Sequence, residues 1–323
     1  MKKQLVFGIL ISAACLYFAL KGTDLSHVGH VLLQAKMGWV FCGLMIYICG
    51  YGLRVWRWKI LLSPIKRLHF GDLAAPLIIG FFANNFLPFR MGEFVRAHIS
   101  GKKFKISRTA SLATIFIERI FDTISFLTTF LCAAFFYPFP AYIERGAFLL
   151  GAGCLGAMVM LWVITTHQAV FEAWVHRVGL KHHWALRVEK FINNFAHGVS
   201  GLRHPRQNAE ALGLSLCIWF IEGMFLLLMS KAFEVHITLA GAFFLLFCLG
   251  LAVTLPQAPG YVGTMEFFGS KALGVLHIPK DQGLSLILAV HAFQFLFILA
   301  LGLWALHHEG LSVTKLLKNR EAL

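Results

Sequence analysis

The chain has 323 residues, of which 58% are hydrophobic and only 14% are charged. With a mean hydropathy of +0.72, this composition excludes a soluble globular domain and a long disordered tail, and it predicts an integral membrane protein. The net charge of +14 does not indicate nucleic-acid binding, because the basic residues gather in loops expected on one side of the membrane. Holding anionic lipid headgroups remains an alternative role for them.

The predicted membrane helices follow from the apolar runs, since about 20 such residues cross a bilayer as a helix. Two further apolar stretches, 72–99 and 238–276, are interrupted midway by Pro, Gly and charged residues. We expect each to form a re-entrant hairpin, because interrupted backbone at bilayer depth must face protein or water. The predicted full spans are 5–20, 37–61, 108–136, 146–165, 208–231 and 283–306.

Loop charges then predict the orientation. Lys2 and Lys3 place the N-terminus in the cytoplasm of a bacterial inner membrane, and the same count places the C-terminus there. The segment 167–207, rich in His, Arg and Trp, is expected to lie as amphipathic helices on the cytoplasmic interface. The expected division is 1–36 (first helix and loop), 37–137 (repeat 1), 138–207 (connecting span and amphipathic segment), 208–307 (repeat 2) and 308–323 (tail).

The two halves resemble each other at an offset of 173 residues, which maps Glu93 onto Glu266 and Glu118 onto His291. Each half is predicted to be helix, broken hairpin, helix, and the two hairpins would enter from opposite sides. The predicted fold class is therefore an all-α polytopic membrane protein, with about six full spans plus two re-entrant helical hairpins arranged as two inverted repeats. Secondary transporters share this plan and bind substrate where the broken helices meet.

The first interrupted motif carries cations. Pro88 is expected to end one half-helix, and Gly92 to allow close backbone approach. The start of the next half-helix and Arg90 together suit a phosphate, through the helix dipole and bidentate hydrogen bonds. A purely structural hairpin, in which Arg and Glu neutralise each other, is the alternative. The candidate substrate-binding residues of this motif are Asn84, Asn85, Arg90, Glu93 and Arg96.

The second interrupted motif has no Arg, but it offers a carboxylate in the matching place, Glu266. Its hairpin-forming residues are predicted to be Pro256, Pro259, Gly260 and Gly263.

A polar stripe runs along the predicted span 108–136, at spacings of three and four residues that place it on one helical face. Arg119 lies beside the stripe and is expected to pair with Asp122 or with a carboxylate on another helix. A buried ion-pair network and a functional cavity both fit this face, and Glu118, Arg119 and Asp122 are candidate substrate-binding residues. The stripe consists of Ser111, Thr114, Glu118, Asp122, Ser125 and Thr129.

Other polar residues give weaker signals. Arg54 and Arg57 are interpreted mainly as interfacial anchors, with a lipid-headgroup contact as the alternative. Glu222 and Ser215 share one helical face, as do His291 and Gln294, and both pairs are expected to line a cavity. The seven cysteines are interpreted as small core residues, forming neither disulfides nor a metal site.

Four motifs in order resemble one membrane family. They are Arg54-x-x-Arg57-Trp58, Asn84-Asn85-x-x-Pro88-x-Arg90-x-Gly92-Glu93-x-x-Arg96, Glu118-Arg119-x-x-Asp122 and Pro259-Gly260-x-x-Gly263-x-x-Glu266. Together they resemble the lysylphosphatidylglycerol synthase transmembrane-region family of flippase-like proteins. The resemblance implies a lipid translocation pathway built around the two hairpins. The chain ends at Leu323 with no aminoacyl-transferase domain, so lysyl-lipid synthesis is not expected.

The sequence thus predicts a lipid flippase-like transporter rather than an enzyme, with no metal, no cofactor and no nucleic-acid partner. The expected partners are membrane lipids: an anionic or zwitterionic phospholipid, or a lipid-linked glycan. A homo-oligomer or a partner enzyme is also compatible with the sequence. Two alternatives remain open, a membrane glycosyl- or phosphoryl-transferase acting on a polyprenyl lipid and a non-transporting lipid-binding subunit.

Overall fold

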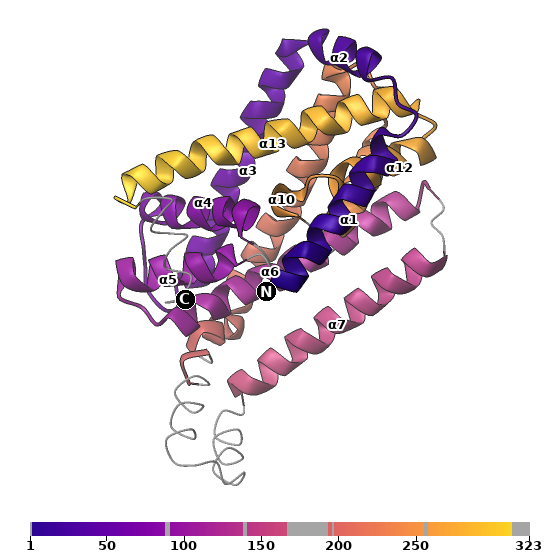
Figure 1. Ribbon diagram of the computed structural model, residues 1–323. Helices are drawn as coiled ribbons and strands as arrows, with labels where there is room; N and C mark the ends of the chain where they lie inside the picture. Colours follow the sequence, from indigo (N-terminus) through magenta and orange to yellow (C-terminus); the bar gives the residue numbers. More distant parts are fainter. Residues whose placement is uncertain are drawn as a thin grey trace.

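A computed structural model describes residues 2–87, 91–137, 141–166, 193–195, 197–254 and 258–311, and this part of the chain is helical with no β-strand (Figure 1). The all-α prediction is therefore confirmed for these residues. The α-helices are α1 (Lys2–Leu20), α2 (Leu25–Leu33), α3 (Met37–Leu62), α4 (Phe70–Phe86), α5 (Gly92–Phe104), α6 (Arg108–Ala134), α7 (Ala141–Thr166), α10 (Pro205–Ala232), α11 (Leu239–Thr254), α12 (Thr264–Val275) and α13 (Lys280–His308), joined by the 3₁₀ helices η2 (Ser200–Arg203) and η3 (Pro259–Tyr261).

The six predicted full spans coincide with the long helices α1, α3, α6, α7, α10 and α13. Within the described ranges, three of them, α3, α10 and α13, are both long and apolar enough to cross a membrane. Helix α6 is as long as these but carries the charges of its polar stripe, which lower its hydropathy. The length and composition of α3, α10 and α13 are those expected of membrane-spanning helices.

Helices α3 and α10 lie side by side at the centre of the fold (Figure 1). Gly50 of α3 allows this approach, because a Cβ atom there would lie 3.2 Å from Ile221. Small residues at helix contacts are typical of membrane proteins, where close packing drives association. The ring of Tyr47 packs on Phe225 with centroids 4.7 Å apart, inside the largest apolar core.

Both interrupted stretches form consecutive helix pairs. Helix α4 packs on α5, and α11 packs on α12, with the break of each pair at the predicted motif. Helix α13 crosses the molecule and contacts α4 and α12 (Figure 1). The order helix, broken pair, helix therefore occurs twice, as α3, α4–α5, α6 and as α10, α11–α12, α13.

Helix α2 corrects the prediction of a plain loop over 21–36. Asp24 caps this helix by accepting hydrogen bonds from the backbone N–H groups of Ser26 (2.9 Å) and His27 (3.2 Å). An Asp directly before a short apolar run is an N-cap signal. The run was too short to suggest a membrane span, and the capping signal was missed for that reason.

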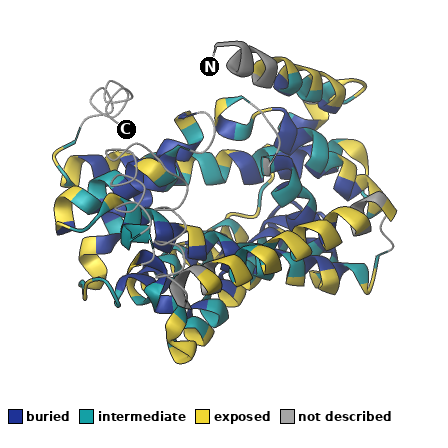
Figure 2. Cartoon of the chain, turned by 90° about the horizontal axis from the view of Figure 1, so that it is seen from below, coloured by how far each residue is buried: buried dark blue, intermediate teal, exposed yellow. Residues whose placement is uncertain are grey.

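The cysteines also differ from expectation. The prediction of buried core residues is wrong, although all seven are free thiols. Figure 2 shows that exposed positions lie along the outward faces of the helices, and in a membrane these faces meet lipid. Lipid-facing and core positions are equally apolar, so hydropathy cannot separate them. The exposed cysteines are Cys42, Cys49, Cys132 and Cys217, and the half-buried ones are Cys15, Cys154 and Cys248.

Several predicted features lie outside the described residues. They include Pro88, Arg90 and Pro256, and most of the segment 167–207 expected to form interfacial amphipathic helices.

Candidate functional site

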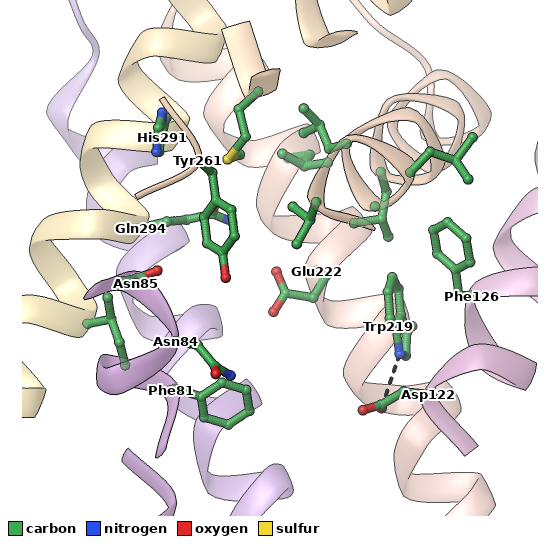
Figure 3. Close-up of a pocket in the computed structure, with 18 of the residues that line it drawn as sticks. Phe81, Asn84, Asn85, Asp122, Phe126, Trp219, Glu222, Tyr261, His291 and Gln294 are labelled. Carbon is green, nitrogen blue, oxygen red and sulfur yellow. Dashed lines mark hydrogen bonds between the residues drawn. The ribbon is translucent and has the colours of Figure 1, made fainter. Parts of the chain in front are cut away.

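A cavity of about 750 Å³ lies among α3, α4, α6, α10, α11 and α13, beside the η3 turn. This volume is within the range of about 300–1,000 Å³ that is typical of ligand sites. Figure 3 shows its polar side chains arranged around an open centre: Tyr261, Gln294, Asn84 and Asn85 lie on one side, and Asp122 and Trp219 on the other. The carboxylate of Glu222 lies between the two groups.

The remaining wall of the cavity is apolar. Leucine and valine side chains of α10 and α11 form part of it, and Leu150 of α7, 39% exposed, adds to it. The cavity therefore offers charged and amide groups on some sides and a hydrocarbon surface on another. The α10 and α11 residues of this apolar wall are Leu226, Leu246, Leu249, Leu251 and Val253.

Arg54 and Glu222 form an ion pair at the cavity wall, with 2.6 Å between Nη2 and Oε1. The Arg54 side chain is only 16% exposed. Its guanidinium lies over the ring of Tyr51 (5.2 Å to the centroid) and near that of Phe81 (5.8 Å), both of which also line the cavity. The prediction of an interfacial anchor is therefore wrong for Arg54, because the residue is a cavity group with a buried partner. The expectation that Glu222 lines a cavity is confirmed.

Arg57 is also not an interfacial anchor, since it is fully buried. Its Nη1 lies 2.5 Å from Asp122 Oδ1 and donates to Ser215 Oγ at 2.7 Å, while its Nη2 lies 3.3 Å from Glu118 Oε1. A buried guanidinium is tolerated only with such partners. They come from α6 and α10, distant in sequence, so the position of Arg57 near a helix end was misleading. Ser215 also shares the Glu222 face as predicted, but it contacts Arg57 rather than the cavity.

Arg96 and Glu118 form a bidentate pair, with both N···O distances at 3.0 Å. Both side chains are buried, and the Arg96 guanidinium stacks on the Trp58 ring at 3.7 Å from its centroid. Two parallel charge-assisted bonds fix α5 against α6. This geometry favours the structural interpretation for these two candidates, because neither lines the cavity.

Arg119 pairs with carboxylates on two helices, as the sequence predicted. It contacts Glu118, lies 3.3 Å from Asp122 and reaches Glu93 of α5 at 3.5 Å. Asp122 also accepts a hydrogen bond from the indole of Trp219 at 3.3 Å (Figure 3). The other members of the polar stripe are buried as predicted: Ser111, Thr114, Ser125 and Thr129.

The first hairpin depends on Gly92, as predicted. A Cβ atom there would lie 2.0 Å from the carbonyl oxygen of Gly80, so α4 and α5 touch through their backbones. The Gly92 N–H donates to the side-chain oxygen of Asn84 at 2.8 Å. Asn84 therefore helps to shape the break and also lines the cavity beside Asn85.

The second hairpin needs its glycines for backbone conformation. Gly260 and Gly263 have φ values of +77° and +88°, and a Cβ atom on Gly263 would lie 2.1 Å from the carbonyl oxygen of Ser12 in α1. Glu266 Oε2 accepts the Gly263 N–H at 2.6 Å, which caps α12. Pro259 opens the η3 turn. Tyr261 follows with φ +63°, a strained value for a residue with a side chain, and its ring enters the cavity.

Glu266 contacts His291 of α13, the residue at the repeat position of Glu118. The His291 Nδ1 lies 2.6 Å from Glu266 Oε1, and its Nε2 lies 2.6 Å from the carbonyl oxygen of Gly260. His291 and Gln294 line the cavity together, as their shared face predicted.

The cavity thus collects four of the predicted substrate-binding residues, while four others lie outside its lining. The aromatic part of the lining was not predicted, since single aromatic residues in apolar helices give no distinct signal. Among the described residues, no group of three His, Cys, Asp or Glu side chains is placed to hold a metal ion. The lining candidates are Asn84, Asn85, Arg119 and Asp122, and the candidates outside the lining are Glu93, Arg96, Glu118 and Glu266. The aromatic residues that were not predicted are Tyr47, Tyr51, Phe81, Phe126, Trp219, Tyr261 and Phe295.

Comparison with known proteins identifies related chains. A family model described as the lysylphosphatidylglycerol synthase TM region matches residues 5–302. A UPF0104 membrane protein of Methanocaldococcus jannaschii is 21% identical over 225 residues, covering 68% of this chain and 91% of that protein. Another, from Methanothermobacter thermautotrophicus, is 25% identical over an alignment of 342 positions, covering 98% and 97%. Glycosyltransferase AglD of Haloferax volcanii is 24% identical over 295 residues, covering 81% of this chain but only 47% of AglD. No solved structure matches.

Proposed function

Because the chain belongs to the family of the lysylphosphatidylglycerol synthase transmembrane region, we propose that it moves a phospholipid or lipid-linked headgroup between the leaflets of a membrane. The observation that carries the proposal is the two-sided lining of the cavity. Charged and amide groups on α3, α4, α6 and α10 suit a headgroup, and the leucines of α10 and α11 suit an acyl chain. A purely polar or purely apolar cavity would accept only one part of a lipid.

Within this proposal, Arg54 and Glu222 recognise the headgroup. A zwitterionic headgroup can replace both halves of their ion pair at once, its phosphate bonding Arg54 and its amine bonding Glu222. Arg54 and Glu222 then each keep a partner of opposite charge while the lipid is bound. An unpaired buried charge is costly, so this exchange favours a zwitterionic phospholipid over a neutral lipid.

The membrane arrangement belongs to the same proposal. The repeats 37–137 and 208–307 would be inverted, with α4–α5 and α11–α12 as re-entrant hairpins and both termini in the cytoplasm of an inner membrane. Rocking of one repeat against the other would open the cavity to each leaflet in turn. The recurrence of helix, broken pair, helix in both halves supports this plan.

The test is lipid translocation in vesicles. Purified protein is reconstituted with a fluorescent zwitterionic phospholipid, and a membrane-impermeant quencher reports how fast the labelled lipid reaches the outer leaflet. The double substitution Arg54→Gln/Glu222→Gln removes both charges together and so leaves no unpaired charge. We expect it to slow translocation about 10- to 100-fold, since a hydrogen bond to a charged group contributes about 1.5–3 kcal/mol.

The matched control is Lys36→Gln/Glu234→Gln, which removes an ion pair of similar length (2.8 Å) whose side chains are 57% and 66% exposed. This variant should translocate lipid at the wild-type rate. Equal rates in both double variants would refute the role of Arg54 and Glu222. Wild-type vesicles no faster than empty ones, whatever the phospholipid offered, would refute the transport proposal.

The second candidate is a transferase acting on a polyprenyl lipid, and the observation that favours it is the similarity to glycosyltransferase AglD. Incubation with a polyprenyl phosphate and a radiolabelled nucleotide sugar distinguishes the two. A labelled glycolipid made by this chain alone would favour the transferase. Inactivity in both assays, together with co-purification of an enzyme, would favour a lipid-binding subunit.

A further inference from the structure

The hydrogen bonds of His291 require a shared proton between its ring and the Glu266 carboxylate. The carbonyl oxygen of Gly260 can only accept, so His291 Nε2 must donate across their 2.6 Å contact. The Nδ1 atom then lies 2.6 Å from Glu266 Oε1, a hydrogen-bond distance that also requires a proton between the two atoms. That proton is held either by the ring, as imidazolium facing carboxylate, or by the carboxyl group, facing a neutral ring.

The pair is buried at the edge of the cavity. Glu266 is 2% exposed and His291 is 8% exposed, and His291 belongs to the lining. The charged groups elsewhere in the lining are each bonded to other partners: Arg54 with Glu222, and Arg119 with Asp122. Helices α1 and α11 pack on α12. The titratable groups of α1 are Lys2, Lys3, Cys15 and Tyr17, that of α11 is Cys248, and η3 carries Tyr261.

Loss of the shared proton would change the geometry. With Nε2 still donating to Gly260, the Nδ1 lone pair would face a negatively charged oxygen at 2.6 Å, and the two atoms would repel each other. Glu266 belongs to α12, and its side chain is held at the start of that helix by a hydrogen bond from the Gly263 N–H. His291 belongs to α13. The repulsion therefore acts between α12, which contributes Met265 to the cavity lining, and α13, which contributes His291 and Gln294 among others.

We propose that Glu266 and His291 form a proton-binding site that couples lipid movement to a proton gradient, an inference that rests on the proposed function of the cavity. The proton enters from water in the cavity and binds between Nδ1 and Oε1, holding α12 against α13. It leaves to water on the other side of the membrane after these helices have moved. One proton then crosses the membrane in each transport cycle.

Glu266→Gln tests the proposal without removing the contact. The glutamine carbonyl oxygen can accept the Gly263 N–H, while its amide can donate to Nδ1 with a proton that does not dissociate. In wild-type vesicles, we expect each unit of pH difference to shift the leaflet distribution of the labelled lipid by up to about tenfold. In Glu266→Gln the distribution should not respond to the pH difference. His291→Gln removes the titrating ring and should give the same loss of response.

The controls are Glu234→Gln and His236→Gln, which make the same replacements in the loop between α10 and α11, away from the cavity. Both should keep the wild-type response. A lipid distribution in wild-type vesicles that ignores the pH difference would overturn the coupling while leaving the transport proposal intact.

A second measurement is independent of transport. The melting temperature of the wild type should fall relative to that of Glu266→Gln as the pH rises, because only the wild type loses its contact when the shared proton dissociates. If the wild type moves no lipid, the transport proposal fails and the melting difference still decides whether the proton site exists. A difference that stays constant with pH would overturn the site.

Discussion

Replacing Glu118 with alanine is expected to lower the free energy of unfolding by about 3–5 kcal/mol. The Glu118 carboxylate is fully buried and contacts three guanidinium groups, those of Arg57, Arg96 and Arg119. Without it, Arg96 loses both of its hydrogen bonds to a carboxylate and remains buried against Trp58. Since proteins are stable by only about 5–15 kcal/mol, much of the variant should fail to accumulate in the membrane.

The measurement is unfolding in a denaturing detergent, followed by fluorescence, together with the amount of protein in the membrane fraction. Glu210→Ala is the matched control, because Glu210 lies on α10 with its side chain exposed. It should change the unfolding free energy by no more than about 0.5 kcal/mol. Equal stability of the two variants would mean that the buried ion pairs do not hold the fold together.

Replacing Gly92 with alanine is expected to cost about 3 kcal/mol, near the upper end for an overpacked site. The added methyl group would lie 2.0 Å from the Gly80 carbonyl oxygen and 2.6 Å from the Asn84 side-chain oxygen. The first of these atoms belongs to backbone and cannot rotate away, so α4 and α5 must separate. Because Asn84 and Asn85 line the cavity, lipid translocation should slow as well, in the vesicle assay described above.

Gly213→Ala is the control for this change. Gly213 lies inside α10, and a Cβ atom there meets no other atom within 4 Å. Alanine should stabilise this helix by about 0.5–1 kcal/mol, since glycine costs that much in a helix interior. Thermal unfolding of the two variants should therefore shift in opposite directions. A shift in the same direction for both would show that the close contact at Gly92 is unimportant.

Much of the fold could be predicted because hydropathy and helical period are local properties. The apolar runs gave the long helices, and the three- and four-residue spacing from Ser111 to Thr129 correctly indicated a face turned toward protein. Gly92 was predicted to be a position of close backbone approach and Gly263 to be a hairpin-forming residue, because glycine permits backbone that other residue types do not. These signals need no knowledge of which helices are neighbours.

The site was harder to predict because its contacts join distant parts of the chain. In the sequence, Arg57 resembles an interfacial anchor, because its partners Asp122 and Ser215 are 65 and 158 residues away along the chain. The partner of Arg54, Glu222, is 168 residues away. Spacing along a single helix cannot pair such residues. It also cannot separate Glu118, which serves packing, from Asp122 one turn later, which lines the cavity.

The polar cluster around the cavity has a further property, because its arginines and carboxylates are equal in number. Each of the four arginines contacts at least one of the four carboxylates, so the cluster carries no net charge. An electrical potential acts on net charge, with about 2.3 kcal/mol per elementary charge for each 100 mV. Moving this cluster, or a zwitterionic lipid, would therefore carry almost no current, whereas the proposed proton carries one positive charge across the membrane. The cluster consists of Arg54, Arg57, Arg96 and Arg119 with Glu93, Glu118, Asp122 and Glu222.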